Sequence, residues 1–307
     1  MNKTLNWLLD GDPSIRWQTL RDLSETPVDE YEKVRAEIAV QGWGAELLSK
    51  QDPSGTWAGG LYSPKWISTT YSMLLLRRLG LQPEHPQALK GCALLIDKGF
   101  YQDGGIAFSK SWGRGETCVT GMVLSILSYF HYQDERISRL VEHLLEHQME
   151  DGGWNCQSYK GATHSSFHTT ISVLEGLREF EKTFNEITAE VQKAQQTGRE
   201  FLLQHRLFRS SRTGEIVKPV FTRFSFPPRW HYDILRVLDY FQECNAERDN
   251  RLIDAIEIVH KKRKKDGRWL LQSHHPGKVF FDMEKVSEPS RWNTLRALRV
   301  LKWWNKE

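Results

Sequence analysis

Apolar residues recur at helical spacing along the chain, in paired segments separated by polar joints. Five such segments come before a joint, at 33–50, 87–98, 136–149, 190–206 and 250–264. Five more come after a joint, at 67–79, 117–131, 167–181, 230–243 and 291–304. A shorter pair at 2–9 and 14–23 precedes them all. This pattern predicts six helical hairpins and therefore an all-α fold.

A sequence motif marks the joints between paired segments. Gln-x-x-x-Gly-x-Trp occurs intact twice, with its tryptophan at Trp57 and at Trp154. Degenerate copies put Ile106, Ile216 and Trp269 at the corresponding positions, which gives successive spacings of 49, 48, 62 and 53 residues. Periods of this length are typical of helical repeats, in which each unit buries its apolar face against a neighbour. Because the sequence has no Pro/Gly/Ser-rich linker, we expect residues 1–307 to form a single domain.

The connections at the two ends of the hairpins differ in length. Short turns such as 79–83 and 245–248 join one hairpin to the next. The joints within the hairpins are much longer, at 57–66, 104–116, 152–166, 208–229 and 267–289. Antiparallel hairpins alternate ends, so we expect the long loops to emerge together on one face. Long loops in compact domains are commonly functional, and we expect the functional site on that face.

Charge and composition narrow the classes of partner. The net charge of +3 in 307 residues argues against a general nucleic-acid partner. The basic run 261–265 falls at a predicted helix end, which favours a solvated surface and leaves contact with an anionic membrane open. No apolar run approaches the length of a transmembrane helix, and no signal-peptide pattern precedes 12. The four cysteines are too sparse for a disulfide framework, so we expect a reducing, cytoplasmic setting.

The repeat motifs carry a resemblance to a known superfamily. Gln-x-x-x-Gly-x-Trp and the Asp-Gly-Gly-Trp string at 151–154 resemble the repeats of squalene–hopene cyclases and protein prenyltransferase β-subunits, most clearly over 41–304. The chain also resembles small bacterial squalene-cyclase-like proteins. The resemblance implies an (α/α)6 toroid whose inside is lined by the helix after each joint. It also implies an enzyme acting on a small apolar or isoprenoid-like molecule. A standard triterpene cyclase is not expected, because the sequence lacks the Asp-x-Asp-Asp string.

The prenyltransferase branch of this resemblance implies a zinc site. Glu116 and Cys118 match an Asp-x-Cys ligand pair at one helix start, and His168 matches the histidine ligand at a later one. Carboxylate, thiolate and imidazole are ordinary zinc ligands, and three of them leave a coordination position open. His164 is a further candidate ligand, and Cys156 is held in reserve. Glutamate replaces the family's aspartate, so a metal-free polar site and a purely structural role remain alternatives.

Two later helix starts gather a second set of polar residues. His231 and Asp233 suit acid–base catalysis, because a neighbouring carboxylate tunes the pKa of a histidine. Arg229 and Arg291 suit an anionic group beside a helix N-terminus, and Glu288 adds another carboxylate. Helix caps and surface ion pairs are the structural alternative for all five residues.

Aromatic residues accompany both sets of polar residues. We expect a substrate pocket walled by Trp66, Trp112, Phe167, Trp230 and Trp292. The leading hypothesis is therefore an enzyme of the toroid superfamily, which would be a transferase, a cyclase or a hydrolase. A non-catalytic toroid that binds a lipid-like ligand or a protein is the first alternative. A carbohydrate-active α/α-barrel enzyme using the carboxylates Glu116, Asp233 and Glu288 is the second.

Overall fold

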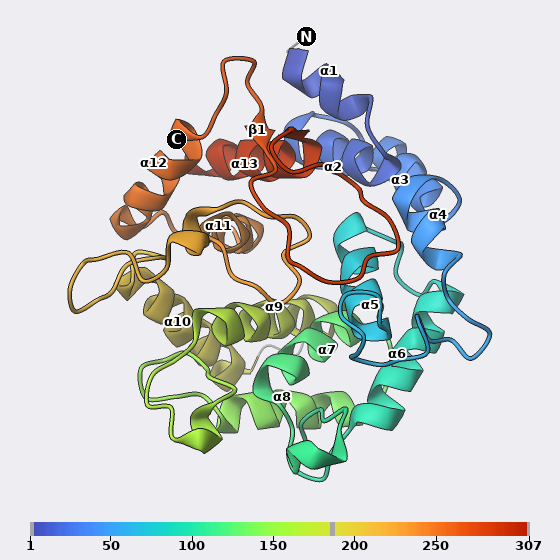
Figure 1. Cartoon of the computed structure of the whole chain (residues 1–307), viewed down its shortest axis with the longest axis vertical. Helices are drawn as coiled ribbons and strands as arrows, with labels where there is room; N and C mark the ends of the chain where they lie inside the picture. Colours follow the sequence, from blue (N-terminus) through green and yellow to red (C-terminus); the bar gives the residue numbers. More distant parts are fainter. Residues whose placement is uncertain (1–2, 185–187, 306–307) are drawn as a thin grey trace. The chain divides into compact units, whose positions relative to one another are not determined.

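The computed structural model describes residues 3–184 and 188–305, and most of its regular structure is helical (Figure 1). Its α-helices are α1 (Lys3–Leu9), α2 (Pro13–Leu23), α3 (Val28–Ala36), α4 (Gly42–Leu48), α5 (Thr69–Leu79), α6 (Pro86–Gly99), α7 (Thr117–Tyr129), α8 (Arg136–Glu146), α9 (Phe167–Phe184), α10 (Ala189–Gln204), α11 (Ile234–Glu243), α12 (Ile253–Lys261) and α13 (Arg291–Trp304). The two short strands β1 (Trp269–Leu270) and β2 (Pro289–Ser290) pair antiparallel. The predicted all-α class is confirmed.

The chain divides into two compact units. We call Lys50–Arg77 with Pro83–Gln204 the central unit, and Met1–Ser49, Arg78–Gln82 and His205–Glu307 together the terminal unit. Helical pairs joined by a long loop occur in both, for example α8 with α9 and α12 with α13. Two predictions depend on how the two units are arranged relative to each other. They are the closure of all the hairpins into one ring and the single domain expected over 1–307, and both stay predictions. Within the described ranges, no helix is long and apolar enough to cross a membrane.

The intact repeat motifs close the joints through the same hydrogen bonds. The side-chain amide of Gln51 donates to the carbonyl of Gly55 at 2.9 Å, and that of Gln148 donates to the carbonyl of Gly152 at 2.7 Å. Each amide also donates to a backbone carbonyl in the first helix of the following hairpin. Gln51 donates to the carbonyl of Gln87 in α6 and Gln148 to that of Ala194 in α10, both at 2.9 Å. The glutamine therefore joins successive hairpins. The motif glycines have φ near +90°, a conformation that glycine adopts without strain.

A threonine on each second helix fixes its register against the joint. The backbone N–H of the joint residue donates to the threonine hydroxyl in four repeats, at 2.9–3.1 Å: Trp57 to Thr69, Ile106 to Thr120, Trp154 to Thr170 and Trp269 to Thr294. These bonds make the four helices equivalent position by position. Cys118 and His168 each stand two residues before this threonine, so they occupy the same position on successive hairpins.

Helices α7 and α9 pack together through glycine. A Cβ atom at Gly121 would lie 2.8 Å from the Cα of Val173, and one at Gly176 would lie 2.5 Å from the carbonyl oxygen of Gly121. Only glycine allows two helix backbones to approach this closely. The contact holds the start of α7 in a fixed place relative to the loop that precedes α9.

The single helix expected over 33–50 is wrong. Helix α3 ends at Ala36, a 3-10 turn follows over Glu37–Ala39, and α4 begins at Gly42. Gly42 has a φ of +63°, and a Cβ there would lie 2.0 Å from a carboxylate oxygen of Asp12. The same carboxylate accepts the backbone N–H of Trp43 at 2.8 Å. A long-range cap, absent from the local apolar pattern, therefore divides the segment in two.

Two other helices of the terminal unit are shorter than the apolar pattern predicts. The expected helix over 230–243 begins only at Ile234, because Pro227 and Pro228 precede an Arg229 held at a φ of +57°. The expected helix over 250–264 is a 3-10 turn over Asn250–Leu252 followed by α12. Local backbone conformation sets where these two helices begin and end, and the spacing of apolar residues does not reveal it.

Buried ionic networks tie helices together within each unit. In the central unit, Arg77 of α5 lies 3.2 Å from Glu179 and 4.0 Å from Glu175, both on α9. In the terminal unit, Arg299 of α13 donates to Asp239 of α11. All five side chains are less than a tenth exposed. Removing one partner of a buried ion pair typically lowers the free energy of unfolding by about 3–5 kcal/mol, so we expect the fold to depend on both networks.

Candidate metal centre

The start of α7 presents a carboxylate and a thiol in its first turn. Glu116 occupies the N-cap position, and its side chain makes no hydrogen bond to the helix N-terminus. Its backbone N–H instead donates to the carbonyl of Ile106 at 2.9 Å, and the hydroxyl of Thr120 donates to its carbonyl at 3.1 Å. These backbone bonds fix the position of Glu116 and leave its carboxylate available for other contacts. Cys118 follows two residues later.

A second thiol comes from the loop that precedes α9. Cys156 lies two residues after Trp154, and its backbone N–H donates to the hydroxyl of Thr169 at 3.4 Å. The preceding Asn155 accepts the backbone N–H of Gln157 at 2.9 Å, which forms a local turn. The side-chain amide of Asn155 also donates to the carbonyl of His164 at 2.7 Å, which ties the two ends of the loop together.

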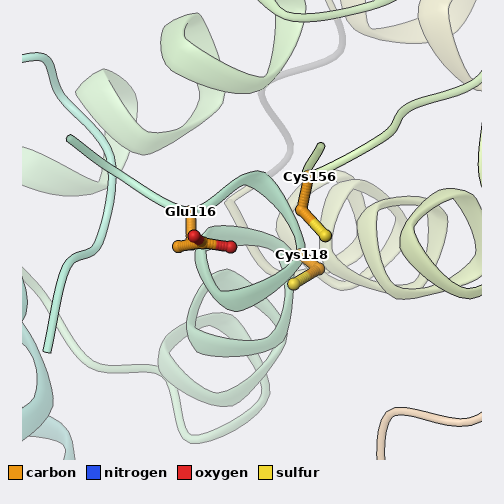
Figure 2. Close-up of side chains that lie close together, drawn as sticks. All are labelled: Glu116, Cys118 and Cys156. Carbon is orange, nitrogen blue, oxygen red and sulfur yellow. The ribbon is translucent and has the colours of Figure 1, made fainter. Parts of the chain in front are cut away.

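These elements bring Glu116, Cys118 and Cys156 together, as Figure 2 shows. One carboxylate oxygen and the two sulfur atoms all lie within 4.8 Å of one another. A tetrahedral zinc ion with bonds of about 2.3 Å to sulfur separates its two thiolates by about 3.8 Å. The limit of 4.8 Å on the separation of the two sulfur atoms includes the spacing of a zinc site. The donor set also suits zinc, which combines thiolate and carboxylate ligands in proteins.

Local interactions make the two thiols unequal. The Cys118 thiol donates a hydrogen bond to the Cys156 sulfur, and the Thr169 hydroxyl and Gln157 amide add to it, so the pKa of Cys156 falls to about 6. The same hydrogen bond, together with burial and the nearby charge of Cys156, raises the pKa of Cys118 well above its ordinary range. The site therefore holds one thiolate and one protonated thiol near neutral pH in the absence of a metal.

The carboxylate responds to the same surroundings. Burial raises the pKa of Glu116, and the charge of Cys156 raises it further, while the cationic Arg114 and Lys160 act in the opposite direction. Arg114 also stacks over the ring of Tyr159. Arg114 comes from the segment before α7, and Lys160 comes from a 3-10 turn before α9. A divalent metal ion would neutralise the two anionic groups directly.

An aromatic cluster adjoins the centre in the same unit. The ring of Tyr62 packs edge-on against Trp112, with centroids 5.7 Å apart, and stacks on Phe108 at 6.1 Å. Tyr71 lies 5.4 Å from Tyr62 and 4.8 Å from Trp66. Burial is the main reason that the pKa of Tyr62 is raised, and the charges of Cys118, Glu116 and Cys156 add to it, so the Tyr62 hydroxyl is within electrostatic reach of the centre.

The predicted histidine ligands take other positions. His168 stands on α9 at the same repeat position as Cys118 on α7, and it is half-buried. His164 is exposed in the loop. Among the described residues, neither belongs to the cluster of ligand atoms that contains Cys118. Of the predicted ligands, the structure therefore brings Glu116 and Cys118 together and adds Cys156, which the sequence analysis held only in reserve.

The second predicted set lies in the terminal unit, where Asp233 serves the fold. Its carboxylate accepts the backbone N–H of Arg236 at 2.9 Å as the N-cap of α11, and it accepts the Ser225 hydroxyl at 2.9 Å. The Ser225 hydroxyl in turn lies 3.2 Å from Nε2 of His275. The ring of His231 stacks on His275 with centroids 3.8 Å apart. His231 and Asp233 are thus neighbours through Ser225 and His275, and their catalytic roles stay predictions.

The remaining members of that set are dispersed. Arg291 donates to the carbonyl of Trp7 at 3.1 Å and lies over the Trp7 ring, so it anchors α1 against the start of α13. Glu288 is exposed on the loop before β2. The carboxylate at this helix start that accepts hydrogen bonds is Glu284, which receives the Ser290 hydroxyl and the backbone N–H of Arg291 at 2.6 Å. Sequence reasoning missed Glu284 because it lies six residues before the cap.

The predicted aromatic wall divides in the same way. Trp66 and Trp112 belong to the aromatic cluster that contains Tyr62 and Tyr71. Phe167 is buried against Phe201 of α10, with centroids 5.3 Å apart. In the terminal unit, Trp292 stacks on Phe226 at 4.1 Å and Trp230 stacks on His231 at 3.8 Å. Of the five predicted residues, two therefore belong to the aromatic cluster around Tyr62, in the same unit as the metal centre. Their role in substrate binding stays a prediction.

Comparison with known proteins yields distant structural likenesses. No protein-family model matches the chain, and no curated protein does. A crystal structure of a protein from Actinoplanes is similar with a TM-score of 0.49 and 14% identity, over 96% of this chain and 91% of that one. The type II terpene cyclase MstE from Scytonema is similar in its apo form, with a TM-score of 0.47 and 16% identity, over 95% of this chain and 88% of that one. A variant of MstE in complex with geranylgeranyl dihydroxybenzoate has a TM-score of 0.48 and 16% identity, over 95% and 86% of the two chains. Likenesses at this level establish neither a family nor an activity for this chain.

Proposed function

We propose that this protein is a zinc-dependent enzyme that acts on a small apolar, isoprenoid-like molecule beside the start of α7. Glu116, Cys118 and Cys156 would hold the metal. The observation that carries the proposal is the approach of their three ligand atoms to within 4.8 Å of one another. These atoms come from two successive hairpins, so the cluster depends on the tertiary fold as well as on the local sequence.

Three protein ligands leave one position of a tetrahedral zinc ion open, where a water molecule or a substrate thiol would be activated by loss of its proton. The protein's own contribution is to fix the ligands before binding. The backbone bonds of Glu116 and the close packing of α7 on α9 hold the carboxylate and Cys118 in place. Thr169 positions Cys156 through its hydrogen bonds to that residue.

The neighbouring aromatic cluster supports an apolar substrate. The charges of Cys118, Glu116 and Cys156 act on the Tyr62 hydroxyl. Ring contacts join Tyr62 to Phe108, Trp112 and Tyr71, and Tyr71 to Trp66. Aromatic side chains offer a large apolar area of fixed shape to a hydrocarbon chain. Arg114 and Lys160 supply positive charge near the carboxylate, which suits a substrate with an anionic end.

Metal analysis of protein purified without a tag or chelator tests the zinc site. We expect about one zinc per chain, lost in Cys118→Ser and in Cys156→Ser. Cys244→Ser is the matched control, because Cys244 is also half-buried but caps the end of α11 in the terminal unit. It should retain the metal. Absence of zinc from the wild type, or its retention in both cluster variants, would refute the proposal.

Substrate class has a separate test. Binding of isoprenoid alcohols and diphosphates of increasing length is measured by quenching of tryptophan fluorescence, in wild type and in Trp112→Ala. We expect affinity to rise with chain length and to fall in the variant, because Trp112 contributes to the aromatic cluster. Equal affinity of both proteins for all these ligands would remove the isoprenoid-like substrate from the proposal.

A further inference from the structure

The Cys156 sulfur lies among several hydrogen-bond donors. The side-chain amide of Gln157 is 4.0 Å away, and the Cys118 thiol and the Thr169 hydroxyl also donate to this sulfur. One of these donors is itself a thiol. The arrangement therefore places a second thiol within reach of the Cys156 sulfur.

The two sulfurs are also placed for a bond between them. Their distance is at most 4.8 Å, so closing to the disulfide length of about 2.05 Å requires a movement of no more than about 2.8 Å. Cys118 is in the first turn of α7, held by the packing of α7 on α9. Cys156 is in the loop between Trp154 and α9, outside any helix or strand. The loop can supply the movement while the helix remains in place.

We propose that Cys118 and Cys156 form a reversible intramolecular disulfide by exchange with a small-molecule disulfide such as oxidised glutathione. The Cys156 thiolate attacks one sulfur of the glutathione disulfide and releases one glutathione thiolate. Cys118 then gives its proton to the released glutathione thiolate and attacks the Cys156 sulfur of the mixed disulfide. The second glutathione leaves as a thiolate and takes a proton from water. The protein is oxidised by two electrons, and one glutathione disulfide is reduced to two glutathione thiols.

The disulfide and the metal exclude each other. Both sulfurs are ligands in the proposed zinc site, and a disulfide sulfur no longer carries the charge that a zinc ligand requires. This consequence rests on the proposed function, whereas formation of the disulfide does not. An oxidant would therefore release the metal, and a reductant would restore the binding site.

The other two cysteines lack these features. Cys92 is fully buried in α6, in the core of the central unit. Cys244 is half-buried at the C-cap of α11, in the terminal unit. We therefore expect the exchange to be selective for the Cys118–Cys156 pair. Cys244 is the matched control because it is half-buried, as Cys118 and Cys156 are.

The test is a redox titration of the full-length protein in glutathione buffers, followed by quenching with an alkylating reagent and peptide mass mapping. We expect the wild type to lose two alkylatable thiols in one step and to give a peptide linking Cys118 to Cys156. Cys244→Ser should behave as the wild type. Cys118→Ser should instead accumulate a glutathione adduct on Cys156, because the resolving thiol is gone.

Two results would overturn the inference. One is the absence of the linked peptide at every buffer ratio, and the other is modification of Cys244 before Cys156. Circular dichroism of each variant shows whether it remains folded, and Cys156→Ser, which should form neither product, provides a second check. Zinc measured on the same samples separates the two proposals. A linked peptide in protein that never held zinc would sustain this inference and refute the zinc site, whereas zinc retained after complete oxidation would refute the mutual exclusion.

Discussion

Two helix starts place a carboxylate at the same point with opposite results. At α11, Asp233 is almost fully buried and accepts the Arg236 backbone N–H and the Ser225 hydroxyl. At α7, Glu116 is only half-buried and makes no cap hydrogen bond through its side chain. Its carboxylate lies beside two thiols instead. A carboxylate before a helix is therefore available for a functional site only when it does not already cap that helix.

Substitution of Asp233 should have the largest effect on stability. In Asp233→Ala, loss of the cap costs about 0.5–2 kcal/mol, and the unsatisfied buried donors add about 1–3 kcal/mol. We expect the free energy of unfolding to fall by about 3 kcal/mol, measured by urea denaturation. The metal content should be unchanged. If Asp233→Ala is as stable as the wild type but has lost its metal, Asp233 serves the metal site and its assignment as a helix cap is wrong.

Glu116→Ala should show the opposite profile. Zinc affinity should fall by at least about 100-fold, measured by competition with a chromogenic chelator, because loss of a ligand costs no less than loss of an outer-shell partner. The free energy of unfolding of the metal-free protein should change by less than about 0.5 kcal/mol, since the side chain makes no cap bond. Glu116→Gln is the matched variant of equal size. A large loss of metal-free stability would mean that the carboxylate serves the helix after all.

Removal of the serine beside Asp233 should have a smaller effect. Ser225→Ala deletes the hydroxyl that donates to Asp233 and lies near His275, and the expected loss is about 1 kcal/mol. Thermal unfolding with a matched surface variant, Ser211→Ala, supplies the measurement and its control. If Ser225→Ala instead destabilises as strongly as Asp233→Ala, the network around His275 contributes more than the cap does.

The pH dependence of thiol reactivity sharpens the comparison without altering the fold. The pKa of Cys156 lies near 6, lowered from an ordinary 9.0, and the thiolate is the form that reacts. The alkylation rate of Cys156 in the metal-free protein should therefore rise with pH, reach half its maximum near pH 6 and be level by about pH 7.5. Cys118→Ala should move the midpoint upward, because it removes the Cys118 thiol, the main hydrogen-bond donor to the Cys156 sulfur. If the alkylation rate of Cys156 in the wild type still rises steeply at pH 8, its pKa is not near 6.

Repeat periodicity made much of the fold predictable. The positions of α6, α7, α9 and α13 follow from the apolar pattern to within a few residues. The pairing of Glu116 with Cys118 was also predictable, since both belong to one helix start. These features depend on contacts that are local or that repeat with the motif. Local pattern is the level at which sequence reasoning is strongest.

The parts that could not be predicted depend on contacts between distant residues. The break before α4 requires the Asp12 carboxylate, which lies thirty-one residues from its partner Trp43. The presence of Cys156 rather than His168 in the cluster depends on how the loop after Trp154 returns to α7, and a local turn at Asn155 is part of that loop. His168 was the better match to the family pattern, but it shares its repeat position with Cys118 and lies one hairpin away. A spacing rule cannot distinguish two such positions.

The central claim is that the cluster at the start of α7 binds zinc through one carboxylate and two thiolates. The most direct test is a crystal structure with diffraction data on both sides of the zinc absorption edge. We expect a single anomalous peak at about 2.3 Å from both the Cys118 and Cys156 sulfurs and at about 2.1 Å from a Glu116 oxygen. A peak bound through His164 or His168 without Cys156, or no peak at this cluster in zinc-soaked crystals, would contradict it.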